Sequence, residues 1–77
     1  MRQINYMDLR DARVTAGVSL AQASGVIGVG DTYLSHVEAG RRRLSPDQVE
    51  RLKAFLAVAL RRRAEQAASL AKTLSAA

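Results

Sequence analysis

Hydrophobic residues along this chain recur every three or four positions, which is the period of an α-helix. A first periodic run covers residues 6–16 and ends at Gly17, a residue type that favours the backbone conformation found after a helix. A second run covers 20–27, where Leu20, Ala23, Ser24 and Ile27 share one face. Residues 1–5 show no period, so they form either a loose arm or an extension of the first helix. The pattern predicts an all-α protein.

A glycine-containing turn separates the second run from a third. Gly28 ends the second run, and the third covers about 31–39, with Leu34 and Val37 on its inward face. Ser19 is placed to cap the second run, because its hydroxyl can accept a hydrogen bond from a free backbone amide of the first turn. Two short helices that meet at a steep angle form a helix-turn-helix unit, whose second helix can lie in the major groove of DNA.

A long helix is predicted to begin at Pro46. The segment Ser45-Pro46-Asp47-Gln48 combines an N-cap, a proline at the first helical position, an acidic first turn and a glutamine that can close a capping box. No glycine or proline follows before Leu74, which predicts one long helix or two abutting ones. Its first half suits a core, whereas the extension 61–77 either pairs with a second subunit or frays. Arg63 interrupts the apolar row, whose candidate dimerisation residues are Leu60, Ala67, Leu70 and Leu74.

Composition narrows the class of protein. At 77 residues the chain is one domain, near the size at which a single core is barely sufficient. It has no cysteine and one histidine, so we expect no disulfide, metal or other cofactor, and no catalytic centre. No signal peptide or membrane span is recognisable, which predicts a soluble cytoplasmic protein without a membrane partner.

The charge of the chain suggests a polyanionic partner. The formal net charge is +5, from 12 Lys and Arg against 7 Asp and Glu. Most of the cations lie within residues 41–63. The three adjacent arginines at 41–43 favour phosphate binding over a solvated loop. Three interpretations remain for the second row of arginines, at 61–63. They could be a solvated helix face, a second phosphate-binding patch, or partners in an intersubunit ion pair with Glu65 or a neighbouring residue.

A set of spaced residues resembles the Cro/C1-type, or XRE, helix-turn-helix family of small bacterial and phage repressors. The resemblance covers roughly residues 6–60 and is carried by Arg13, Gly17-Val18-Ser19, Gly28-Val29, Leu34-Ser35, Val37-Glu38 and Gly40. It implies a lambda-repressor-like domain of four to five helices over 1–60, followed by the helical extension. Leu20 departs from the pattern, since many relatives have a glutamine there that contacts the DNA backbone.

The resemblance also implies roles for individual residues. The residues implied to contact base edges are Asp31, Thr32 and His36. Those implied to contact the DNA backbone are Ser19, Tyr33, Ser35, Arg41, Arg42 and Arg43. Arg13 and Glu38 are implied to form a structural ion pair. Asp31 is ambiguous, because its carboxylate either accepts a hydrogen bond from cytosine or caps its own helix, and we favour the cap. Tyr33 serves packing, a phosphate contact, or both, and Ser35 contacts the groove or bonds within its helix.

The expected function is that of a sequence-specific regulator, most simply a repressor. It would bind double-stranded DNA at an inverted repeat as a homodimer, in the cytoplasm on the nucleoid, with a regulatory protein as a further partner. Two other interpretations remain open. One is a protein-interaction adaptor that keeps the fold, and the other is a nonspecific nucleic-acid binder driven by its arginines.

Overall fold

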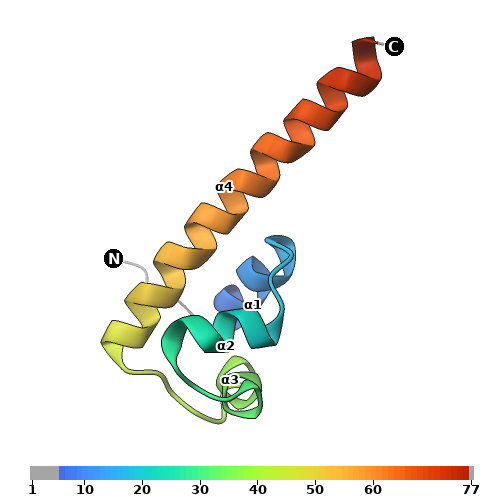
Figure 1. The fold of residues 1–77 in the computed structure, drawn as a ribbon. Helices are drawn as coiled ribbons and strands as arrows, with labels where there is room; N and C mark the ends of the chain where they lie inside the picture. Colours follow the sequence, from blue (N-terminus) through green and yellow to red (C-terminus); the bar gives the residue numbers. More distant parts are fainter. Residues whose placement is uncertain (1–5, 77) are drawn as a thin grey trace.

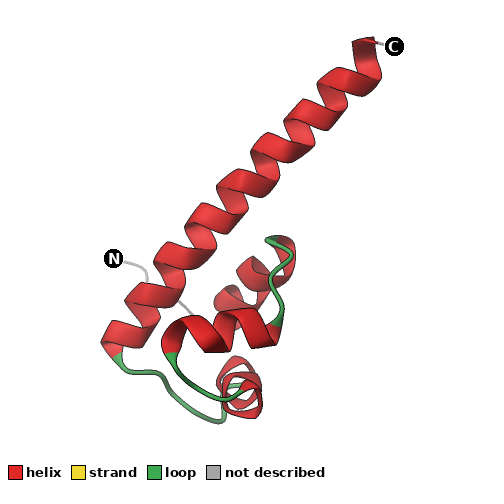
Figure 2. Ribbon diagram, viewed as in Figure 1, coloured by secondary structure: helices red, strands yellow, loops and turns green. Residues whose placement is uncertain are grey.

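The protein folds into four helices. The computed structural model describes residues 6–76, with side chains from Asp8 onward, so the expected arm or extension at 1–5 lies outside the described residues. The elements are α1 (Tyr6–Thr15), α2 (Leu20–Ile27), α3 (Asp31–Glu38) and α4 (Pro46–Ala76). Helices α1 to α3 form a small body against the first half of α4, while its second half extends away (Figure 1). Only helices and short loops occur among the described residues (Figure 2), which confirms the all-α prediction.

Residues from all four helices and two loops build one hydrophobic core. The buried side chains sit at the three- and four-residue spacings of the sequence, because such positions share one face of a helix. Leu34 and Leu52, at 1% and 2% exposure, are among the largest fully buried side chains. The complete core is Leu9, Ala16, Val18, Ala23, Ile27, Leu34, Val37, Leu44, Leu52 and Leu56.

Two capping boxes fix where α2 and α4 begin. Ser19 Oγ accepts from the Gln22 amide at 3.0 Å, while the Gln22 side chain accepts from the Ser19 amide at 2.9 Å. Ser45 and Gln48 repeat this exchange at 3.1 and 2.9 Å. Gln48 Nε2 also donates to the Ile27 carbonyl at 3.4 Å, so the start of α4 is tied to the end of α2. Both predicted helix starts are confirmed.

Glycine is favoured at position 17, in the turn between α1 and α2, by its backbone conformation. Its φ of 72° lies in the left-handed region, which is unfavourable for residues with a Cβ. The guanidinium of Arg63 from α4 lies where a Cβ would be, but it is the end of a flexible, exposed side chain that can move aside. Arg63 lies on the same side of α4 as Leu60 and Ala67, and its guanidinium reaches the turn after α1.

Helix α4 is a single helix, and its two halves differ in burial. Leu52 and Leu56 are buried, and Leu60 is half-buried against the core, which leaves part of its side chain exposed. All described residues after Leu60 are exposed; we call residues 64–76 the arm. Leu70 and Leu74, at 58% and 77% exposure, carry its largest apolar side chains. No described helix is both long and apolar enough to cross a membrane.

Candidate nucleic-acid interface

Helix α3 lies at one end of the body, with α2 between it and α4 (Figure 1). The chain turns from α2 into α3 at Gly28, whose φ of 71° ends α2 and whose amide bonds to the Ser24 carbonyl. Leu34, Val37 and Glu38 form the buried side of α3. The rest of the helix surface includes Asp31, Thr32 and Ser35, which are exposed, and His36, which is half-buried. We call these four residues the recognition face.

Asp31 is held by α2 and does not cap its own helix, so the favoured prediction of a cap is wrong. The N-cap of α3 is Gly30, which provides no side-chain hydrogen bond. Asp31 Oδ1 instead accepts from the hydroxyl of Ser24 at 2.7 Å. Ser24 is only 2% exposed, and its hydroxyl reaches Asp31 because α2 and α3 pack directly together. The carboxylate therefore occupies a defined position at the edge of the recognition face next to α2.

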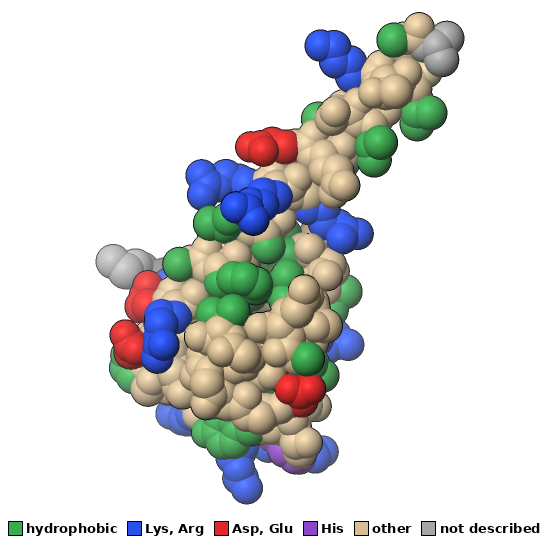
Figure 3. All heavy atoms as spheres, in the orientation of Figure 1, with side chains coloured by type: hydrophobic (Ala, Val, Ile, Leu, Met, Phe, Trp, Pro, Cys, Tyr) green, Lys and Arg blue, Asp and Glu red, His purple; other side chains and the backbone are tan. Residues whose placement is uncertain are grey.

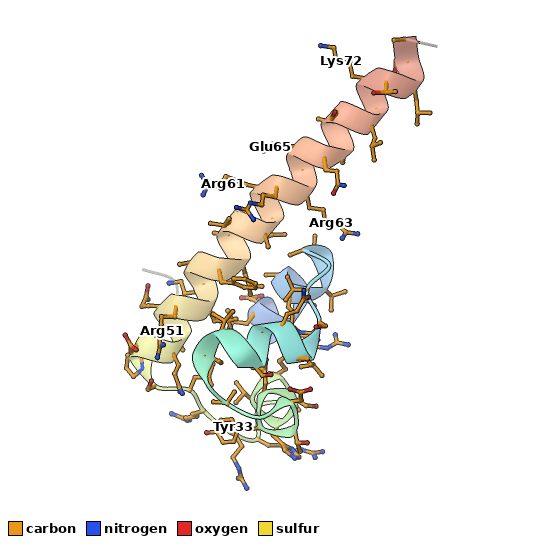
Figure 4. All side chains as sticks on the ribbon, in the orientation of Figure 1. Tyr33, Arg51, Arg61, Arg63, Glu65 and Lys72 are labelled. Atoms are coloured by element: carbon orange, nitrogen blue, oxygen red, sulfur yellow. The ribbon has the colours of Figure 1, made fainter. Side chains whose placement is uncertain are left out.

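Tyr33 fastens the loop that follows α3. Its hydroxyl donates to the carbonyl of Arg43 at 2.6 Å, and its side chain is 38% exposed (labelled in Figure 4). The loop is fixed at its other end as well, since the amide of Arg41 donates to the His36 carbonyl at 2.8 Å. All three side chains of this basic loop, Arg41, Arg42 and Arg43, are exposed. A constrained backbone thus presents three cations beside the recognition face.

Arg13 and Glu38 form an ion pair behind the recognition face. Arg13 Nε lies 2.7 Å from Glu38 Oε2, and Nη2 lies 3.0 Å from Oε1, so the contact is bidentate. The two side chains are only 13% and 7% exposed. Arg13 Nη1 also donates to the Val18 carbonyl at 2.9 Å. The pair joins α1, the α1–α2 turn and the end of α3, and it is too enclosed to contact DNA directly.

The positive charge of the described surface is concentrated in two places. On α4, Asp47 pairs with Arg51 and Glu50 with Lys53, which neutralises the first two turns. Within residues 8–76 no ion pair involves the basic loop or Arg61, Arg62 and Arg63. Figure 3 shows blue side chains around the purple histidine at the α3 end, and a second group where the arm leaves the body.

The structure brings most of the predicted DNA-contacting residues to one end of the molecule. Thr32, Ser35 and His36 share the recognition face with Asp31, and the basic loop adjoins it. Ser19 begins α2, where its hydroxyl is engaged in the capping box. The dimerisation candidates Ala67, Leu70 and Leu74 lie on the arm, away from this surface (Figure 1).

Sequence reasoning missed the role of Ser24. A serine on the inward face of α2 looks like a small substitute for alanine, and its partner becomes visible only when α2 and α3 are packed. The sequence does contain one indication of this contact: a serine on the predicted inward face of one helix, followed by a carboxylate at the first position of the next helix. Among the described residues, no group of three or more His, Asp or Glu side chains is arranged to hold a metal ion.

Comparison with known proteins places the chain in a family. Neither the curated proteins nor the solved structures contain a match to it. The family model described as a helix-turn-helix domain matches residues 8–66, which include α2, α3, the basic loop and the ion pair. This match covers most of the chain and supports DNA as the partner. The protein therefore belongs to the helix-turn-helix domain family.

Proposed function

We propose that the protein is a sequence-specific transcriptional regulator of the Cro/C1 type, a repressor that occupies an operator and blocks polymerase. The observation that carries this proposal is the recognition face lying beside a basic loop that has no acidic partner among the described residues. In a helix-turn-helix protein, polar side chains of the second helix contact base edges, while cations contact phosphates. In this role the protein binds DNA and catalyses no reaction. Its proposed location is the cytoplasm, on the nucleoid.

The arm supports a dimeric form of this regulator. Its charged residues Glu65 and Lys72, like Arg61 just before it, project from the side of α4 that faces away from α1 (Figure 4). Leu70 and Leu74 are exposed elsewhere around the same helix and lie four residues apart, with Ala67 one turn before Leu70. An apolar helical surface of this kind is suited to pairing with a second helix. A two-fold dimer recognises an inverted repeat, with its α3 helices about 34 Å apart.

The test separates phosphate contacts from base contacts. Binding sites are first selected from random-sequence DNA, and affinity is then measured across a series of salt concentrations. Arg42→Ala should weaken binding to all sequences alike and reduce the slope of log K against log salt by about 0.9, the value for one lost phosphate contact. Thr32→Ala and His36→Ala should instead change the preferred bases.

Lys72→Ala is the matched control, because it removes a cation from the arm and leaves the recognition end intact. Its salt slope should equal that of the wild type. If Arg42→Ala changed base preference while Thr32→Ala and His36→Ala acted uniformly, the assigned roles would be reversed. Equal competition by scrambled DNA would identify a nonspecific nucleic-acid binder.

One observation favours a second candidate, a protein-interaction adaptor. A groove of about 550 Å³ lies between α4 and the α1–α2 turn, with Val18, Phe55 and Val58 among its lining residues and Arg62 at its rim. None of its lining residues comes from α3 or the basic loop, so a regulatory protein bound there would leave the recognition face free. Absence of DNA binding even at low salt would favour the adaptor over the repressor.

A further inference from the structure

Ser24 is a polar residue at a position that packing alone would give to an apolar one. It lies on the core side of α2 between the buried residues Ala23 and Ile27, and it is 2% exposed. Its hydroxyl lies 2.7 Å from Asp31 Oδ1 and 3.1 Å from the Ala21 carbonyl. A buried hydroxyl needs a hydrogen-bond partner, so the direction of its single proton decides what this residue does.

The proton of Ser24 points to Asp31. A hydroxyl can donate only once, and a bond to a carboxylate is shorter and about twice as strong as one to a neutral carbonyl. The 2.7 Å distance fits such a charge-assisted bond, whereas 3.1 Å to Ala21 is long for an O–H donor. The bond occupies one acceptor site of the carboxylate, which retains further sites on its two oxygens.

Asp31 therefore presents an oriented carboxylate at the start of α3. It is the first residue of the helix and is exposed. The neighbouring Gly30 has no atoms within 4 Å of where a Cβ would lie, so access from this side is open. Residues near the start of a recognition helix are those that contact base edges. An oriented side chain loses less entropy on binding than a mobile one, which favours a specific contact.

We propose that Asp31, oriented by Ser24, selects for a base that offers an amino group in the major groove, and for cytosine above all. The inference rests on the proposed DNA-binding function and deepens it. A carboxylate can only accept hydrogen bonds, and it is repelled by the acceptors O6 and N7 of guanine and O4 of thymine. Adenine offers its N6 amino group but places the N7 acceptor beside it. Cytosine offers N4 with a C–H group on its own ring beside it, so O6 of the paired guanine is the only acceptor next to this amino group, whereas the amino group of adenine has an acceptor on both sides.

The test is a comparison of four duplexes that differ only at the position facing Asp31. Selection with the wild-type protein identifies the site, and selection with Asp31→Ala identifies the position at which preference is lost. At fixed salt, the wild type should bind the cytosine duplex about tenfold more tightly than the thymine duplex, a ratio equal to about 1.4 kcal/mol. Asp31→Ala should bring this ratio close to one, and Asp31→Asn should move the preference toward adenine.

Ser24→Ala tests the positioning role of the serine. It should reduce the cytosine-to-thymine ratio to about threefold, without the uniform loss of affinity for all four duplexes that a purely structural defect would cause. Helix content by circular dichroism and the melting temperature show whether the variant is folded. Ser69→Ala, the same substitution on the arm, should behave as wild type. If Ser24→Ala is unfolded, the Asp31→Asn result alone decides the base assignment.

The outcomes distinguish this inference from the function on which it rests. Failure of the wild type to enrich any motif would overturn the proposed function and the inference together. An enriched motif in which Asp31→Ala weakens all four duplexes equally would overturn only the inference, because Asp31 would then be a brace between α2 and α3. An unchanged ratio in folded Ser24→Ala would overturn the positioning role of Ser24.

Discussion

At the scale of single residues, Arg13 joins the most distant parts of the body. Its guanidinium makes two contacts to Glu38 and one to the Val18 carbonyl, so a single side chain links α1 to the α1–α2 turn and to α3. Charges taken out of water are costly unless every group is paired, and here the carboxylate receives two hydrogen bonds. The position of α3 therefore depends on a pair that itself never reaches DNA.

Loss of Arg13 should be among the most damaging single changes in the chain. Arg13→Ala leaves Glu38 buried without its cation, and we expect a loss of about 3–5 kcal/mol in the free energy of unfolding. Urea denaturation followed by circular dichroism measures this change. Glu50→Ala, which breaks an exposed pair with Lys53, should change stability by less than about 1 kcal/mol.

A double variant separates the two causes of that loss. Arg13→Met with Glu38→Met removes both charges and keeps apolar volume, so it should recover much of the stability lost in Arg13→Ala. If it were as unstable as the single variant, the hydrogen bond to Val18 would be the dominant contribution of Arg13.

At the scale of elements, α2 contains Gly25, a residue type that is unfavourable in a helix interior. A Cβ at this position meets no atom within 4 Å, so close packing does not require the glycine. Gly25 is also exposed, so an alanine could replace it without displacing a neighbour. The proposed role of Ser24 would make the stability of α2 relevant to the orientation of Asp31.

Gly25→Ala should therefore stabilise the protein. Alanine in a helix interior is favoured over glycine by about 0.5–1 kcal/mol, which corresponds to a rise of several degrees in melting temperature. Gly28→Ala is the matched control with the opposite expected sign. Its φ of 71° is left-handed and its surroundings are open, so only backbone strain of about 1 kcal/mol acts. A fall in melting temperature with Gly25→Ala would reveal packing that the open position does not show.

The elements predicted from sequence are those whose limits are set locally. The caps at Ser19 and Ser45 and the turn at Gly28 depend on neighbours within a few residues, and the observed α2 has the predicted bounds. Contacts between elements could not be predicted in the same way. The carboxylate of Asp31 could bond to its own helix or to Ser24, and the choice depends on how α2 crosses α3. The contact of Arg63 with Gly17 likewise depends on where α4 lies against α1.

At the scale of the whole molecule, the recognition face and the arm lie at opposite ends. The molecule measures 48 × 30 × 19 Å, and α4 follows its long axis, since 31 residues span about 46 Å. The recognition face and basic loop occupy one end, and the arm forms the other (Figure 1). Because the core ends at Leu60, the arm is not needed to complete the body.

Truncation after Arg63 should accordingly separate assembly from folding. The shortened chain should keep its cooperative thermal transition but sediment as a monomer at concentrations where the wild type is a dimer. Leu70→Glu with Leu74→Glu should act in the same way, because charges oppose burial of the arm. Lys72→Ala is the control on the charged side. Unchanged sedimentation of the truncated chain would place the dimer contact elsewhere.

The unbroken course of α4 has a mechanical consequence. No glycine or proline occurs between Asp47 and the end of the arm, so the helix has no hinge. The 13 residues beyond Arg63 form a lever of about 20 Å that is continuous with the helix supporting α2. In the proposed dimer, any rotation of two arms against each other would turn the two recognition faces by the same angle. The angle between the paired arms and the spacing of the half-sites would then be a single variable, set by alanines and leucines at the end of the molecule remote from the recognition face.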